Sequence, residues 1–419
     1  MLSNASTPLL GLVDTGVVGQ IPDPAYIGAV AVGSLIFTFV FWAFGFLRMG
    51  TTGLTAQALG AGNAEEVAAC LGRALAIGGA VAAALILLQW PIREIAFALL
   101  DASPAVEQLA RGYFDIRIWA APATLANYAL LGWFVGLGRT DIGLVLQLVL
   151  NVTNIALDAV LVLGFGLAVR GVAAGTVIAE FLAAAVGLVI ALRYGRRFGV
   201  RWRTDLVLAT DKLRRTLAVN VDIMIRSLAL IAMFVWFVSR GATLGDVILA
   251  ANAVLLNFIS VAAFFLDGLA FAAEALVGRA IGAAHRAGLT AAARMTTLWA
   301  AGVAIVISAL LATLGHVLID LVTVDPGARA AAREYLPWAA LIPVLGVWAF
   351  QLDGIFIGAT RTADMRNAML ASLGIYLGAW WLLKPFGNHG LWAAFCVSYF
   401  ARAGSLLYYY PALVRSVPA

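Results

Sequence analysis

The sequence predicts an all-α polytopic membrane protein, with about twelve transmembrane helices in two pseudo-symmetric six-helix bundles around a central cavity. Three observations support this fold class. Hydrophobic residues make up 63% of the 419 positions and charged residues only 12%, whereas soluble domains carry about 25% charged residues. Apolar segments of about 20 residues, the length that crosses a bilayer, recur along the chain. The two halves of the chain also resemble each other.

The composition excludes several classes of protein. A mean hydropathy of +0.97 leaves too little polar surface to coat a soluble globule. The net charge of +5 reflects basic cytoplasmic loops, so no nucleic-acid partner is expected. Cys70 and Cys396 predict no disulfide framework, and the three histidines have no metal-ligand spacing, so no metal is expected. The first apolar segment contains an acid and lacks a basic leader, so we expect no cleavable signal peptide.

The spans follow one another at intervals set by Pro, Gly and charged residues. They are predicted at Leu2–Ile21, Tyr26–Leu47, Ala68–Leu88, Phe114–Leu137, Ile142–Leu163, Gly171–Leu192, Leu217–Val238, Val247–Leu276, Thr296–Ile319, Tyr335–Gly358, Met369–Leu383 and Gly390–Tyr410.

Basic residues set the predicted orientation. The connection between the sixth and seventh spans carries most of them, from Arg193 to Arg215, whereas the first loop has no Lys or Arg. Even-numbered connections and both termini are therefore expected in the cytoplasm. This predicts an amino-terminal bundle over residues 1–193, a basic linker over 194–215 and a carboxy-terminal bundle over 216–419.

An internal repeat relates the two halves. "GWFVGLGRT" from Gly132 matches "GIFIGATRT" from Gly354 at an offset of 222, and the same offset places Gly60 over Gly282. After a three-residue gap, "RGVAAGTVIAEF" from Arg170 matches "HGLWAAFCVSYF" from His389. An even number of spans per half makes the repeat parallel, the plan of transporters whose bundles rock around a central cavity.

Ionisable residues at membrane depth are costly and are functional candidates. The candidates within the predicted spans are Asp14, Asp158, Glu180, Asp222, Arg226, Asp267, Glu274, Asp353 and Arg402.

One group of polar residues agrees in depth. Asp14 and Thr176 each lie about 10 Å inside the predicted outer boundary, at 1.5 Å per residue. Asp158 lies near the outer end of the fifth span, and Asn154 is one turn earlier on the same helix face. Together they predict a site for a proton or a hard cation, because two carboxylates in a dry site hold one or the other. The alternative is that both acids snorkel to water at helix ends.

The remaining candidates have less certain roles as cavity or second-lobe residues. Asp353 lies in the tenth span, where its repeat counterpart is Leu131. Asp222 and Arg226 are one turn apart and can pair with each other. Glu180 can line a cavity or lie at a helix end. The 44 aromatic residues would suit amphipathic organic cations, although interfacial anchoring explains most of them.

Five stretches carry a resemblance to a known family. They are "STPLLGLVDTGVVGQI", "FLRMGTTGLTAQALGAGN", "NVTNIALDAVLVLGFG", "GVAAGTVIAE" and "DGIFIGATRTADMRNAML". Together they resemble the MATE (multidrug and toxic compound extrusion) family, in its DinF-like branch. The resemblance implies two six-helix bundles, cation-coupled efflux of organic compounds, and an amino-lobe cation site at Asp14, Asn154, Asp158 and Thr176.

Three departures from the family pattern qualify the resemblance. The family's first helix usually starts further upstream, so we expect the assigned start at Met1 to be late or the chain truncated. Asp353 matches a tenth-helix aspartate of the NorM-like branch, but its acidic companion is replaced by Leu230, which puts a second cation site in doubt. The resemblance also leaves the coupling ion open between H⁺ and Na⁺.

The predicted function is secondary active antiport, with organic, drug-like, cationic or amphipathic compounds leaving in exchange for H⁺ or Na⁺. No Walker motif and no cofactor are expected. Small organic substrates and the lipid bilayer are the expected partners, and the protein is expected to work as a monomer in the inner membrane. The alternatives are a flippase for a lipid-linked sugar, with Arg226 and Arg402 as its cationic groups, and a membrane-embedded enzyme such as a prenyl transferase.

Overall fold

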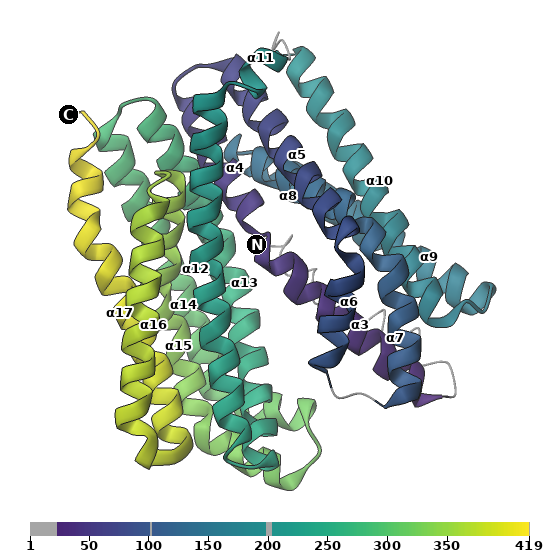
Figure 1. Cartoon of the computed structure of the whole chain (residues 1–419). Coiled ribbons are helices and arrows are strands. Elements are labelled where there is room, and N and C mark those ends of the chain that lie inside the picture. Colours follow the sequence, from purple (N-terminus) through teal and green to yellow (C-terminus); the bar gives the residue numbers. More distant parts are fainter. Residues whose placement is uncertain (1–22, 101–102, 198–202, 419) are drawn as a thin grey trace. The chain divides into compact units, whose positions relative to one another are not determined.

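The computed structural model describes residues 23–100, 103–197 and 203–418, and this part of the chain consists of helices joined by short turns (Figure 1). It divides into two compact units. Within the described residues, one unit contains 23–55 and 63–216, and the other contains 56–62 and 217–418. The predicted boundaries at residues 193 and 215 stay predictions.

The first unit contains the helices of the amino-terminal half, with most of α4. They are α3 (Pro24–Ala43), α4 (Phe46–Gly60), α5 (Ala64–Leu87), α6 (Gln89–Ala98), α7 (Pro104–Arg117), η1 (Ile118–Ala120), α8 (Ala121–Gly136), α9 (Thr140–Asp158), η2 (Ala159–Gly164), α10 (Ala168–Arg197) and α11 (Thr204–Val207).

The second unit contains the helices of the carboxy-terminal half. They are α12 (Thr210–Ala242), α13 (Asp246–Gly282), α14 (Arg286–Val322), α15 (Pro326–Gly358), α16 (Thr362–Leu383), η3 (Lys384–Phe386) and α17 (Gly387–Arg415). Within this unit α13 packs against α14 and α15, and α16 runs beside α17 (Figure 1).

Local sequence explains where several helices begin. Asn63 caps α5 by accepting a hydrogen bond from the Glu66 amide at 2.9 Å. Asp325 caps α15 in the same way, and Pro326 follows it at the first helical position. Side-chain oxygens at such positions satisfy amides that the helix cannot pair, and proline loses nothing there.

Membrane spans fall where hydropathy predicts them. Ten helical segments of the described chain are long and apolar enough to cross a bilayer. They contain the second to twelfth predicted spans, with the last two joined in Thr362–Arg415 through the short turn η3. The first predicted span, Leu2–Ile21, lies outside the described residues. Large apolar side chains such as Trp299 and Leu321 are 66% and 78% exposed, as lipid-facing positions require.

The internal repeat is visible in the backbone. Residues with positive φ at helix junctions recur at the offsets that the sequence indicates. The pairs are Gly62 with Ala284 and Gly138 with Thr360 at an offset of 222, and Ala168 with Gly387 at an offset of 219. The three-residue gap predicted near the end of each half accounts for the change of offset.

Each unit also contains the same close helix crossing. A Cβ atom on Gly132 of α8 would lie 2.3 Å from the Arg48 carbonyl oxygen of α4. A Cβ atom on Gly354 of α15 would lie 2.5 Å from the Ala270 carbonyl oxygen of α13. Both members of each crossing differ by 222 residues from their counterparts. Small residues permit such close approach, which stabilises helix pairs in lipid.

Gly132→Ala should therefore destabilise the first unit by about 1–3 kcal/mol, because the added methyl group must push α8 away from α4. Gly79→Ala is the matched control, since a Cβ atom there meets nothing within 4 Å. Thermal unfolding of the detergent-solubilised protein measures both. Equal melting temperatures for the two variants would contradict the close packing of α8 against α4 at Gly132.

Aromatic residues form part of the interior of the second unit. Phe237, Trp392 and Phe395 are almost completely buried, and the Phe237 and Trp392 rings lie 4.9 Å apart. The Trp392 indole donates to Asn252 Oδ1 at 2.9 Å, and Asn252 exchanges two amide hydrogen bonds with Asn388. The indole of Trp392 and the amide of Asn252 are thus paired inside this aromatic core.

Part of the basic linker is docked on the first unit. Arg73 of α5 donates to the Leu206 carbonyl oxygen at 2.8 Å, and Arg203 pairs with Glu65 at 3.3 Å. The hydrogen bond from Arg203 also lowers the pKa of Asp205. The short helix α11 is therefore attached to α5.

Candidate functional site

Asp158 is the last residue of α9, directly before the π-helical turn η2. Its side chain has no exposed surface. π-Helical turns inside long helices are frequent at functional sites because they re-aim the neighbouring side chains. A carboxylate buried inside a membrane span is expensive unless it is functional or well compensated.

Asn154 and Thr176 are brought together near Asp158. Asn154 is fully buried one turn before Asp158 on α9, and Thr176 of α10 is 5% exposed. The Asn154 amide donates to Thr176 Oγ1 at 3.2 Å, and the Thr176 hydroxyl donates to the Val172 carbonyl oxygen at 2.9 Å. Asn154 and Thr176, for which the sequence predicts a common depth, are therefore in direct contact.

Gly175 explains how Asp158 reaches α10. A Cβ atom at position 175 would lie 2.5 Å from Asp158 Oδ1, so a larger residue there would require the carboxylate to shift. Glycine lets the carboxylate lie this close to the α10 backbone. The contacts of Gly175 and Thr176 thus join α9 and α10 at one oxygen-rich point.

Asp14, the fourth predicted member, lies outside the described residues. The described members offer one carboxylate, one amide oxygen and one hydroxyl. Within the described part of the chain, no three His, Cys, Asp or Glu side chains gather into a metal site. The arrangement can hold a proton on Asp158, or contribute oxygen ligands to a hard cation.

Glu180 lies one turn further along α10 and is 7% exposed. Its carboxylate accepts from Arg117 of α7 at 3.3 Å and from Asn127 of α8 at 2.8 Å. The Arg117 guanidinium also lies over the Phe37 and Phe41 rings. Glu180 is therefore an interior ion-pair residue, not a helix-end acid.

Asp353 is the centre of a second buried ion cluster. Arg226 of α12 and Arg402 of α17 both contact its carboxylate from different helices. All three residues are less than 8% exposed. Asp267 and Glu274 of α13 add negative charge around Arg226. Arg226 and Arg402, the two cationic groups that the flippase alternative would use to bind a pyrophosphate, therefore both pair with Asp353.

The predicted pairing of Asp222 with Arg226 is wrong. Asp222 accepts from Arg366 at 2.6 Å and from the Thr362 hydroxyl at 3.1 Å. Arg226, one turn along the same helix, pairs with Asp353 instead. The two side chains are directed to different neighbouring helices, because packing brings Arg366 of α16 within reach of Asp222 and Asp353 of α15 within reach of Arg226.

The chain is similar to known proteins over most of its length. The MatE family model matches residues 1–160 and 223–379. The chain belongs to the MatE family. It is 40% identical to DNA damage-inducible protein F of Escherichia coli (strain K12) over 406 residues, which is 97% of this chain and 88% of that protein. It is 29% identical to a probable multidrug resistance protein NorM of Rhizobium meliloti (strain 1021), over 98% of this chain and 90% of that protein.

Solved structures of the MatE fold match closely. A crystal structure of MATE in the bent conformation has a TM-score of 0.90, with 17% identity over 99% of this chain and 94% of that one. An outward-facing MATE family multidrug resistance transporter has a TM-score of 0.89, with 16% identity over 100% of this chain and 94% of that one. These matches confirm the predicted fold class.

Membership of the MatE family makes this protein a multi-pass membrane efflux transporter. It is not an enzyme, so the prenyl transferase alternative is wrong. The predicted DinF-like resemblance agrees with the 40% identity to DNA damage-inducible protein F.

Several functional candidates of this MatE transporter escaped the sequence argument. Arg117 lies in the first turn of the predicted fourth span and is not among the sequence-based candidates. Asn127 is a polar residue inside an apolar helix, which is a signal that could have been used. Gly175 cannot be distinguished from the other 41 glycines without knowing what lies opposite it.

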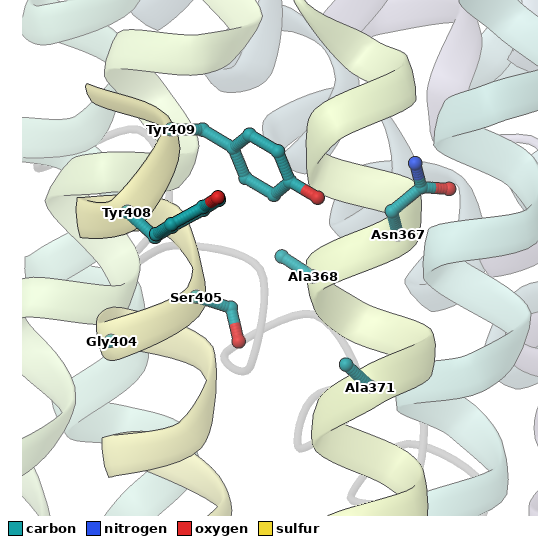
Figure 2. Close-up of a pocket in the computed structure, with 7 residues that line it drawn as sticks. All are labelled: Asn367, Ala368, Ala371, Gly404, Ser405, Tyr408 and Tyr409. Carbon is teal, nitrogen blue, oxygen red and sulfur yellow. The ribbon is translucent and has the colours of Figure 1, made fainter. Parts of the chain in front are cut away.

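A separate surface hollow of about 350 Å³ lies between α16 and α17. Figure 2 shows Tyr408 and Tyr409 on one side of it, with Asn367, Ala368 and Ala371 on the other. Tyr408 is 80% exposed. The hollow contains none of the predicted site residues.

Proposed function

We propose that this MatE transporter is a secondary active antiporter that exports small organic, drug-like compounds, cationic or amphipathic, in exchange for an ion by alternating access. The observation that carries the proposal is the carboxylate of Asp158, fully buried in a membrane span beside Asn154, Gly175 and Thr176. A charge in that place is stable only while it is compensated, so binding and loss of a cation there change the energy of the surrounding helices.

H⁺ is the favoured coupling ion. Sodium and other hard cations need several oxygen ligands. Thr176 Oγ1 already accepts from Asn154 and donates to Val172, so it has one lone pair left for a cation. A proton needs only one carboxylate oxygen. In this scheme the proton binds Asp158, with Asp14 as its partner, from the outward-facing state and drives release of the exported compound.

We infer that the protein works as a monomer in the inner membrane, with both termini in the cytoplasm. The basic residues around α11 support this orientation, because cytoplasmic loops are enriched in Lys and Arg. Sided labelling of exposed linker residues in oriented vesicles measures the orientation, and light scattering of the solubilised protein measures the mass. Labelling of these residues from the periplasmic side would show the opposite orientation.

Proteoliposomes test the proposed function directly. With a pH gradient alone, the wild-type protein should move several chemically unrelated cationic dyes against their gradients, and a sodium gradient alone should not. Sodium-driven transport without proton-driven transport would assign the other ion. Flipping of a lipid-linked sugar in the same vesicles, with no dye transport, would overturn the proposal in favour of a flippase.

A further inference from the structure

A second buried carboxylate, Glu180, lies on α10, the helix that also carries Thr176. Thr176 and Glu180 are four residues apart, so they lie on the same helix face about 6 Å apart along the axis. Thr176 contacts Asn154 of the Asp158 site. Glu180 contacts Arg117 and Asn127. One face of α10 therefore carries Thr176, which belongs to the Asp158 site, and Glu180 one turn later.

Three buried polar atoms around these acids have no hydrogen-bond partner among the described residues. They are Asn154 Oδ1, Asn127 Oδ1 and Arg117 Nη1. Asn154 is fully buried and Arg117 is 8% exposed. Buried polar atoms in proteins are nearly always paired, and ordered water supplies the partner where the protein does not. Water can therefore be expected at Asn154 in the Asp158 site and at Asn127 and Arg117 beside Glu180.

Charged and polar groups from neighbouring helices face Glu180. Arg117 of α7 stabilises the carboxylate, and Asn127 of α8 donates to it whether or not it is ionised. Tyr128 of α8 lies within electrostatic range of Glu180, Arg117 and Arg48, and α9 contributes Asp158. On α3 the neighbours of Arg117 are the apolar rings of Phe37 and Phe41.

We propose that Glu180 is a proton relay between Asp158 and the Arg193–Arg197 end of α10. The proton leaves the Asp158 carboxyl group, which becomes a carboxylate again, and crosses ordered water to a Glu180 oxygen. The neutral Glu180 holds Arg117 less tightly and then releases its proton to water on the cytoplasmic side. This inference rests on the proposed proton antiport.

The alternative role of Glu180 is structural, as one half of an ion pair that holds α10 against α7. Glu180→Gln separates the two roles only in part, because it leaves Arg117 buried without a counter-charge. The double variant Glu180→Gln with Arg117→Gln removes both charges and keeps amide hydrogen bonding. Glu66→Gln is the matched control, since Glu66 pairs with the buried Arg73 outside this network.

Two transport assays in proteoliposomes decide between the roles. Efflux driven by a pH gradient needs proton passage, whereas exchange of labelled for unlabelled dye at equal pH does not. Both Glu180→Gln and the double variant should lose proton-driven efflux by about tenfold or more, a typical effect of removing a proton-transfer group, and should keep dye exchange. Glu66→Gln should keep both activities.

The relay is overturned if proton-driven efflux survives in Glu180→Gln. It is also overturned if the double variant recovers proton-driven efflux, or if both variants lose dye exchange together with efflux, because each result assigns a structural role. Failure of the proposed function has a different signature, since the wild-type protein itself would then show no efflux driven by a pH gradient.

Discussion

Asp158→Asn is expected to abolish ion-driven efflux and leave the protein folded. Asparagine has the shape of aspartate and fits the same space against Gly175, but it cannot exchange a proton. Coupled transport should therefore fall by about 100-fold or more. The melting temperature should stay the same or rise, because a buried charge is removed.

Asp141→Asn is the control on the same helix. Asp141 lies in the first turn of α9, where its side chain is 62% exposed and pairs with Arg139. Both variants are reconstituted and assayed for dye efflux under a pH gradient. Wild-type efflux by Asp158→Asn would remove Asp158 from the coupling site. Asp14→Asn extends the test to the predicted partner, which should behave like Asp158→Asn.

Asp353→Asn is expected to be the most destabilising single change among the predicted site residues. It leaves Arg226 and Arg402 buried within the membrane without the carboxylate that both contact. Removing one partner of a buried ion cluster costs about 3–5 kcal/mol, because a charge remains uncompensated. Thermal unfolding of the solubilised protein should show a large fall in melting temperature.

Asp320→Asn provides the comparison for this second change. Asp320 pairs with Arg333 in a half-exposed ion pair, with side chains 40% and 43% exposed. Loss of such a pair costs about 0–1 kcal/mol. A triple variant with Asp353→Leu, Arg226→Met and Arg402→Met should recover much of the stability. If Asp353→Asn unfolds like the wild type but shifts the pH dependence of transport, Asp353 is instead a titrating coupling residue.

The two ion clusters show how far sequence reasoning reached into the site. Depth along each span predicted a common level for Asn154 and Thr176, because rise per residue is constant in a helix, and these two side chains contact each other. Their ionisable side chains within predicted spans made Glu180, Asp353 and Arg402 candidates. The sequence did not single out Arg117 and Asn127, and it did not pair Arg402 with Asp353, because partner choice depends on how helices rotate and pack.

Asp222 and Arg226 illustrate the limit most clearly. Their spacing permits a pair on one helix, and an isolated helix would favour it. In the folded unit, Arg366 of α16 takes Asp222, and Asp353 of α15 takes Arg226. Packing therefore supplied partners from neighbouring helices in place of the partner on the same helix.

The amino-acid sequence by itself determined the membrane environment, the helical spans and the repeat with its offset of 222. These properties depend on hydrophobicity and on period, which are local and can be read along one dimension. The tertiary structure alone decided that α9 meets α10 at Gly175, that Asp353 neutralises two arginines, and that Glu180 lies one turn from the Asp158 site. These contacts depend on the rotation and close approach of whole helices, which no single segment encodes.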